Sequence, residues 1–269
     1  MPPGSGMETY FAEGNQGAYF VKVGAPVERY LTIAELGLTP PVIAHGRLED
    51  GSSVIVQPRI KGRTPSQKDY WENLEKAAGI IRGLHNEPSI QSILPPASSN
   101  LHRDVGWQAL DALHQRWEHY KTRVPDVAEF VETALAQLAS KINMFSTKGL
   151  VASHSDICNA NWLIAFDGKI YLIDLDSMSL DDPAQDLGAF LWWYYPPELR
   201  ERFLEIAGYG YDEEFRSRMQ VRRSMHFLNI TLSREQSFDR FDPAHYGERL
   251  DDFRASLEGR ENPKGYRGS

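Results

Sequence analysis

The segment His154-Ser-Asp156-Ile-Cys-Asn-Ala-Asn161 decides how this chain folds, together with the stretch that follows it. Residues 162–166 and 169–174 are mostly apolar, β-forming runs, and the dipeptide Asp167-Gly168 separates them. An Asp-Gly pair between two such runs is a strong signal for a β-hairpin closed by a two-residue turn. The sequence therefore predicts a hairpin that begins directly after the quoted segment.

The predicted turn also fixes which residues face each other across the hairpin. It places Ile164 opposite Tyr171 and, at the open end, Asn161 opposite Asp174. Directly opposed residues have Cβ atoms about 4.5–5.5 Å apart, so an amide oxygen and a carboxylate converge there. Asp176 would share the face of Asp174 if the strand continued, because side chains alternate along a strand.

This cluster of oxygen ligands suits a hard cation. Mg²⁺ takes one or two protein carboxylates and fills its other positions with water and phosphate oxygens, so Asn161, Asp174 and Asp176 are candidate ligands. Asp156 is a further carboxylate nearby, free to orient or deprotonate a hydroxyl group. The arrangement is that of metal-assisted phosphoryl transfer. The alternative for Asp176 is a turn residue before Ser177.

The N-terminal part is predicted to be rich in β-structure, with one helix. The expected elements are strands over 7–12 and 18–23, a helix over 27–36 ended by Gly37, and a hairpin over 42–48 and 53–60. Residues 61–65 then form a connector. We therefore predict a small β-rich lobe over residues 1–60.

Residues 61–269 are predicted to form a larger helical lobe that holds the β-hairpin as an insertion. Apolar spacing predicts one amphipathic helix over 69–85 and further helices over 105–144 and from Met178 to about residue 260. The whole chain is thus expected to be an α+β protein with two lobes. The aromatic run 192–195 is expected to pack inside a helix.

Composition indicates a folded protein and disfavours several other classes of protein. Hydrophobic residues make up 41% of the 269 residues, which is enough for a folded core. The single cysteine, Cys158, cannot form an internal disulfide, which favours a cytoplasmic protein. The net charge of −8 disfavours nucleic-acid binding, and no apolar run predicts a signal peptide or a membrane span.

The motif His154-x-Asp156-x-x-x-x-Asn161, followed by Ile173-Asp174, resembles the catalytic loop of the aminoglycoside phosphotransferase and choline kinase families. The resemblance implies a two-lobed, protein-kinase-like fold. It also implies that Asp156 is the catalytic base or positions the acceptor hydroxyl, and that Asn161 and Asp174 hold Mg²⁺, with Asp176 touching a second Mg²⁺. His154 would then buttress the loop.

The resemblance extends to the first lobe and to the start of a later helix. Lys22 is similar to the family's strand lysine that binds the α- and β-phosphates of ATP or GTP, with Glu28 as its expected partner. Gln57 to Ile60 fall where the hinge would meet adenine, and Gly4-Ser-Gly6 where a loop would cover the phosphates. The family's first strand is expected to be missing. Asp186 is similar to the aspartate that accepts hydrogen bonds from the catalytic-loop backbone. Alternatives are an edge-strand role for Lys22 and a solvated one for Glu28.

The resemblance implies a small-molecule kinase that transfers the γ-phosphoryl group to a hydroxyl. The acidic C-terminal part, with Tyr211-Asp-Glu-Glu-Phe215 as a candidate lip, favours a cationic acceptor such as an aminoglycoside. For this segment, the interpretation as a solvated helix start is the favoured one. Alternatives are a nucleotide-binding pseudokinase and a metal-dependent phosphohydrolase. The acceptor's identity, the choice between ATP and GTP, and the oligomeric state are left open.

Overall fold

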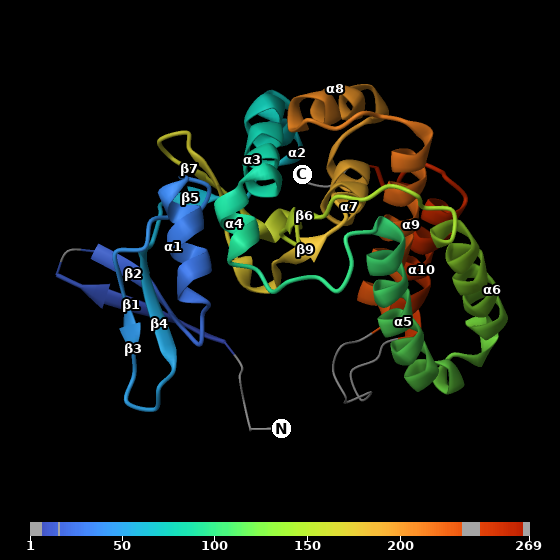
Figure 1. Ribbon diagram of the computed structural model, residues 1–269, viewed down its shortest axis with the longest axis horizontal. Coiled ribbons are helices and arrows are strands. Elements are labelled where there is room, and N and C mark those ends of the chain that lie inside the picture. Colours follow the sequence, from blue (N-terminus) through green and yellow to red (C-terminus); the bar gives the residue numbers. More distant parts are fainter. Residues whose placement is uncertain (1–6, 16, 233–242, 266–269) are drawn as a thin grey trace.

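The computed structural model describes residues 7–15, 17–232 and 243–265 and has two lobes (Figure 1). The smaller lobe is an antiparallel sheet in the order β1-β2-β4-β3. Its strands are β1 (Glu8–Gly14), β2 (Gly17–Val23), β3 (Ala44–Arg47) and β4 (Ser53–Pro58). The two predicted hairpins of this lobe are therefore confirmed.

Helix α1 (Val27–Glu35) is the helix of the smaller lobe. The helix ends just before Gly37, which adopts a left-handed conformation with φ of 72° and so stops it. That conformation costs a glycine little and lets the Leu38 amide donate back to the Ile33 carbonyl, 3.2 Å away. Tyr30 and Ile33 form the buried face of α1, whereas Glu28 is exposed to solvent.

The connector after residue 60 is part of a second sheet. Strand β5 (Gly62–Arg63) pairs with β7 (Trp162–Ala165), which pairs in turn with β8 (Ile170–Leu172). Gly62 allows this pairing, because a Cβ atom there would lie 2.4 Å from the Ile164 carbonyl oxygen. The junction between the lobes is thus fixed by strand pairing, and the division at residue 60 stays a prediction.

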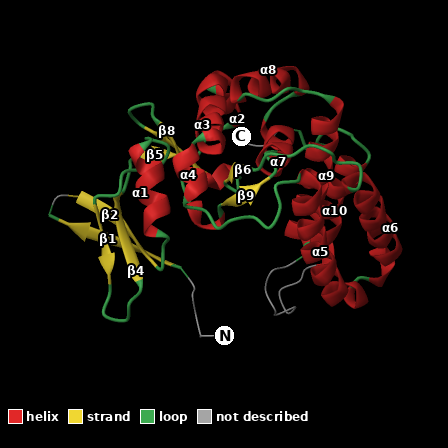
Figure 2. Ribbon diagram, viewed as in Figure 1, coloured by secondary structure: helices red, strands yellow, loops and turns green. Residues whose placement is uncertain are grey.

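The larger lobe is mainly helical (Figure 2). Its helices are α2 (Gln67–Glu72), α3 (Leu74–Asn86), α4 (Pro88–Ser92), α5 (His102–Tyr120), α6 (Pro125–Ile142), α7 (Ala184–Tyr194), α8 (Pro197–Ala207), α9 (Glu213–Thr231) and α10 (Pro243–Leu257). The single helix predicted over 69–85 was wrong, because the chain breaks at Asn73 between α2 and α3. No helix in the described part of the chain is long and apolar enough to cross a membrane.

Helix α7 runs through the centre of the larger lobe and is buried nearly all round. Trp192 contacts Phe227 of α9 with ring centroids 4.8 Å apart, and Phe190 stacks on Trp162 of β7 at 5.3 Å. The prediction that residues 192–195 serve helix packing is confirmed. Strands β6 (Val151–Ser153) and β9 (Ser179–Asp181) pair beside α7 and bracket the predicted hairpin.

Candidate active site

The hairpin forms as predicted, but its register differs by one residue. Ile164 pairs with Ile170, and the Ile173 amide donates to the Asn161 carbonyl at 2.9 Å. The loop holds three residues, 166–168, and Gly168 is its one residue with a positive φ (84°). A three-residue loop with glycine in the left-handed position uses the same Asp-Gly pair as the two-residue turn. Asn161 therefore lies opposite Ile173 and not opposite Asp174.

Asp174 leaves the strand ladder with a left-handed backbone, at φ of 61°. Such a conformation is uncommon outside glycine and is often found at functional sites. Asn161 and Asp174 both line the same pocket between the lobes. The predicted convergence of these two side chains is therefore seen, through a different backbone route.

Asp156 lies in the loop between β6 and a short 3-10 turn, η2 (Asn159–Asn161). The side-chain amide of Asn161 donates to the Asp156 carbonyl at 2.7 Å and lies 3.3 Å from its carboxylate Oδ2. Ser155, just before it, is the other described non-glycine residue with a positive φ, at 66°. This bent loop holds Asp156 beside the predicted metal ligand Asn161.

Asp186, at the start of α7, anchors the loop from below. Its fully buried carboxylate accepts hydrogen bonds from the His154 and Ser155 amides at 2.8 and 2.9 Å, and from the Ser153 hydroxyl at 2.9 Å. His85 Nε2 lies 2.9 Å from the same carboxylate. Burial alone would raise the pKa of Asp186, but the bond from His85 and the loop amides lower it below its ordinary value. The structure thus places Asp186 as the resemblance implies.

Two histidines complete this framework. His154 Nε2 lies 3.0 Å from the Ile173 carbonyl, so it donates there and ties the loop to the residue before Asp174. His85 comes from α3, and its other nitrogen meets the Tyr209 hydroxyl at 2.6 Å. Sequence analysis missed His85, because nothing near it in the chain shows that a distant carboxylate faces it.

Lys22 points from β2 across the gap between the lobes. Its ammonium nitrogen lies 3.2 Å from Asp174 Oδ1, 3.1 Å from Asp176 Oδ2 and 2.7 Å from the Tyr30 hydroxyl. The prediction that Glu28 pairs with Lys22 was wrong. Glu28 lies on the solvent face of α1, and the buried Tyr30, two residues later, takes that place.

Helix α1 also forms hydrogen bonds with the segment after Asp174, through two residues that were not predicted from the sequence. Arg29 donates to the carbonyls of Leu175 and Asp176, both at 2.8 Å. The Tyr30 hydroxyl donates to Asp176 Oδ1 at 2.7 Å and lies 3.2 Å from the Leu175 amide. The signal available was the position of Tyr30 on the apolar face of α1.

These contacts give the two carboxylates different properties. Burial and the neighbouring Asp174 raise the pKa of Asp176. Burial also acts on Asp174, but its contact with Asp176 and the charge of Lys22 lower its pKa overall. Asp174 is half-exposed, with 51% of its side-chain surface accessible, whereas Asp176 is 14% exposed. Asp174 is therefore the more acidic of the two carboxylates and the one that is open to a ligand.

The pocket between the lobes, called here the interlobe pocket, has a volume of about 270 Å³. Its walls include Lys22, Gln57, Ile60, Asn161 and Asp174. The Gln57 side chain is engaged by the Pro40 carbonyl, to which it donates at 2.6 Å, so it does not project into the pocket as a free group. The predicted phosphate loop Gly4-Ser-Gly6 lies outside the described residues.

The donor set in the interlobe pocket fits Mg²⁺. Asn161 and Asp174 offer one amide oxygen and one ionised carboxylate, and Mg²⁺ is bound by few protein ligands because it keeps water and phosphate oxygens. Within the described ranges, no group of three or more His, Cys, Asp or Glu side chains could hold a metal. Asp176 fits less directly, because Tyr30 and Lys22 already occupy its two oxygens.

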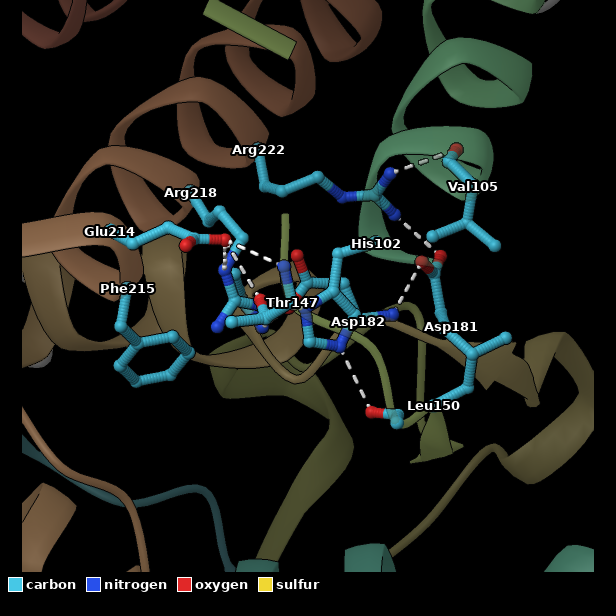
Figure 3. A network of polar contacts seen from close by, with 12 residues as sticks. His102, Val105, Thr147, Leu150, Asp181, Asp182, Glu214, Phe215, Arg218 and Arg222 are labelled. Carbon is cyan, nitrogen blue, oxygen red and sulfur yellow. Dashed lines mark hydrogen bonds and ion pairs between the residues drawn. The ribbon is translucent and has the colours of Figure 1, made fainter. Parts of the chain in front are cut away.

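A second pocket, the C-lobe pocket, opens beside the loop on the side of α5 and α9. It has a volume of about 310 Å³, and Ser155, Asp181 and Arg222 are among its lining residues. Arg222 donates to Asp181 at 2.5 Å and to the Val105 carbonyl at 3.4 Å, which joins α9 to β9 and α5 (Figure 3). Sequence analysis missed this pair, since its members come from distant segments.

The predicted acidic lip at 211–215 does not border the C-lobe pocket. Asp212 accepts a hydrogen bond from the Phe215 amide at 2.7 Å and so caps α9. Glu214 accepts hydrogen bonds from the amides and hydroxyls of Ser146 and Thr147 at 2.8–3.1 Å (Figure 3 draws Glu214 beside Thr147). Burial acts to raise the pKa of Glu214, but these bonds lower it to about 2. The alternative of a helix start is therefore the correct one.

Cys158 lies in the loop between Asp156 and Asn161. Burial raises the pKa of its thiol, and the nearby Asp156 carboxylate raises it further. A raised pKa keeps the thiol protonated and weakly nucleophilic. The loop therefore offers no thiolate nucleophile at neutral pH, and Asp156 stays its candidate reactive group.

Comparison with solved structures identifies similar folds. A spectinomycin phosphotransferase in complex with ADP and spectinomycin matches with a TM-score of 0.63 and 18% identity, covering 98% of this chain and 88% of that one. A choline/ethanolamine kinase family protein from Mesorhizobium loti matches at 0.62 and 16%, covering 96% and 94%. A GDP complex of an aminoglycoside 2′-phosphotransferase matches at 0.66 and 12%, covering 95% and 91%.

These structures share the protein-kinase-like arrangement of a small antiparallel sheet and a larger helical lobe. The predicted fold class is therefore confirmed. The model of the phosphotransferase enzyme family matches residues 2–227, which include Lys22, the loop of Asp156 and the carboxylates 174 and 176. On that match, the chain belongs to the phosphotransferase enzyme family and has a protein-kinase-like fold.

Proposed function

We propose that this protein is a small-molecule kinase, which transfers the γ-phosphoryl group of ATP or GTP to a hydroxyl group of an acceptor in the C-lobe pocket. One observation carries the proposal: two residues next to Asp156 line two different pockets. Its hydrogen-bond partner Asn161 lines the interlobe pocket, and its neighbour Ser155 lines the C-lobe pocket. Similar folds have been crystallised with ADP, AMP and GDP, which supports a nucleotide in the first pocket.

Lys22 would bind the nucleotide phosphates. Its ammonium group already lies between two carboxylates at 3.1–3.2 Å, so it stands where phosphate and metal charges would meet. Tyr30 and the paired carboxylates hold it in place. Asn161 and Asp174 would hold Mg²⁺, which would supply positive charge to neutralise the phosphates.

Asp156 would orient the acceptor hydroxyl and accept its proton as the phosphoryl group moves in line. Catalysis would come from positioning and charge stabilisation, with no covalent enzyme intermediate. The acceptor lies in the C-lobe pocket under this proposal. Residues 211–215 do not indicate the charge of the acceptor, because their carboxylates cap α9 and anchor the loop at 146–147.

The test measures ADP or GDP release with Mg-ATP and Mg-GTP across amino sugars, choline, homoserine, thiamine and macrolides. We expect Asp156→Ala to lower turnover by about 10²–10⁴-fold, the usual contribution of a positioned general base, and to leave nucleotide affinity unchanged. The control is Asp167→Ala, a carboxylate in the exposed hairpin loop. Equal turnover in wild type and Asp156→Ala would remove Asp156 from the reaction.

A second candidate is a nucleotide-binding regulatory module without transfer activity. The observation that favours it is that helix α1 offers Lys22 the neutral hydroxyl of Tyr30 where a carboxylate was expected. Micromolar nucleotide binding without product release from any acceptor would support this candidate. The complete pair of Asp156 and Asp174 favours the kinase.

A further inference from the structure

A third pocket lies between α7 and α9, with the chain after α10 at its edge; it is called here the α7–α9 pocket. Its volume is about 190 Å³. Gly188, Leu191 and Trp192 of α7 line it. At 100° per residue these positions lie on the opposite side of α7 from Asp186, so the pocket is separate from the loop of Asp156.

Positive charge dominates the described lining of this pocket. Arg200 of α8 and Arg216 and Arg223 of α9 converge on it, against the single carboxylate of Glu261. Arg200 is buried, with 8% of its surface exposed, and binds Glu261 through two hydrogen bonds of 2.6 and 2.9 Å. Two positive charges are left without a carboxylate among these lining residues, in a chain whose net charge is −8.

Arg223 holds the inner of these two charges. Its Nε donates to the Ser256 hydroxyl at 2.8 Å, and its guanidinium carbon lies 5.2 Å from the centre of the Trp192 ring. No other hydrogen bond of Arg223 is seen among the described residues. Burial, together with repulsion from Arg200, lowers the pKa of Arg223 to about 10. Its remaining donors therefore stand in a charged pocket where an anion would relieve both effects.

Arg216 holds the outer charge at the rim. It is exposed, its guanidinium carbon lies 4.8 Å from the centre of the Tyr211 ring, and its Nε is 3.4 Å from the Asp212 carbonyl. Stacking on an aromatic ring orients a guanidinium without using its terminal donors. Arg223 and Arg216 thus face one small cavity from positions about two turns apart on α9.

We propose that the α7–α9 pocket is an anion site that binds a dianionic phosphoryl group, as free phosphate or as a small phosphate ester, through Arg216 and Arg223. Guanidinium groups match the oxygen geometry of phosphate and are enriched where it is recognised. Glu261 competes for the same charge by binding Arg200. The site is distinct from the interlobe pocket and does not depend on the transfer reaction.

The experiment is calorimetric titration with inorganic phosphate, in parallel with chloride at equal ionic strength. The full chain carries Lys22→Ala so that phosphate binding in the interlobe pocket is removed. We expect phosphate to bind and chloride not to bind. Glycerol phosphate, titrated in the same way, distinguishes the sources: tighter binding than inorganic phosphate points to an ester, and equal binding to free phosphate.

Three single substitutions make the test specific. Arg216→Gln, at an exposed position, is expected to weaken phosphate binding at least tenfold, or about 1.4 kcal/mol. Glu261→Gln is expected to tighten it several-fold, because it removes the competing carboxylate. Arg202→Gln is the control, since Arg202 is an exposed arginine of α8 that pairs with Glu75. Equal phosphate and chloride binding, or equal effects of Arg216→Gln and Arg202→Gln, would overturn the site.

Discussion

Two carboxylate regions flank the loop of Asp156, and they are built in opposite ways. Asp186 is fully buried and accepts hydrogen bonds from three consecutive residues, 153–155, through both of its oxygens, and His85 lies against Oδ2. Asp174 is half-exposed and shares the single cation Lys22 with Asp176. The first region is fully satisfied by fixed partners, whereas the second leaves oxygen atoms open on the pocket.

The difference separates a framework from a set of exchangeable ligands. A buried carboxylate with complete partners fixes the backbone around it, and removing that charge is costly. A half-exposed carboxylate beside a like charge gives little stability and is available to a cation. We therefore expect substitutions in the first region to act on folding and those in the second to act on transfer.

The largest effect is expected for Asp186→Asn. The amide group would face two of the donors that Asp186 now accepts, leaving buried polar groups unsatisfied, so the free energy of unfolding should fall by about 3–5 kcal/mol. Urea denaturation measures this, with Asp111→Asn on the exposed side of α5 as the control. Equal stability of the two variants would contradict the framework role of Asp186.

Asp174→Asn is expected to affect turnover strongly and stability only slightly. It removes one of two like charges at an exposed position, so the free energy of unfolding should change by less than about 1 kcal/mol. Turnover at saturating Mg²⁺ should fall about 100-fold or more, because the carboxylate that is proposed to hold Mg²⁺ is lost. A strongly destabilised variant, or one with full turnover, would break the comparison.

Tyr30→Phe tests the second region, around Asp174 and Asp176, at a smaller scale. The ring stays in the core of α1, but Lys22 loses an acceptor and Asp176 loses a donor. One charge-assisted hydrogen bond contributes about 1.5–3 kcal/mol, so kcat/KM for the nucleotide should fall about 10- to 100-fold. Tyr19→Phe in β2 is the matched control, and an equal effect of both substitutions would exclude the bridging role.

Glu214 extends the comparison to an anchoring carboxylate remote from both pockets. Its pKa is lowered to about 2 from an ordinary value of 4.5, so it stabilises the fold above about pH 4.5 and loses that contribution as the pH falls towards 2. At neutral pH, the free energy of unfolding of the wild type should exceed that of Glu214→Gln by about 2 kcal/mol. Chemical denaturation from pH 7 to pH 2.5 should show this difference shrink, and a constant difference would refute it.

The sequence was sufficient for the features that depend on neighbouring residues. The hairpins and the end of α1 at Gly37 follow from turn residues and from apolar patterns. Asn161 and Asp174 line one pocket as predicted, but the left-handed backbone of Asp174 that brings them together was not foreseen. The register of the main hairpin was missed because one Asp-Gly pair serves both a two-residue and a three-residue loop. Glu28 was chosen by charge, although burial on α1 favours Tyr30.

The features that were missed depend on segments far apart in the chain. His85 reaches Asp186, and Arg222 reaches Asp181, only after the helices of the larger lobe have packed. Local periodicity contains no information on such pairs. The carboxylates of residues 212 and 214 were likewise assigned to a pocket on net charge alone, whereas their hydrogen bonds direct them to the α9 cap and to the turn at 146–147.

The position of Cys158 makes the loop directly observable in solution. The chain has one thiol, and it lies between Asp156 and Asn161, protonated and partly covered. Alkylating reagents and thiol-reactive fluorophores therefore label a single atom in the middle of the loop, at a rate set by how often that thiol is exposed and ionised. A slow labelling rate that changes when nucleotide is added would report the motion of this loop without any engineered cysteine.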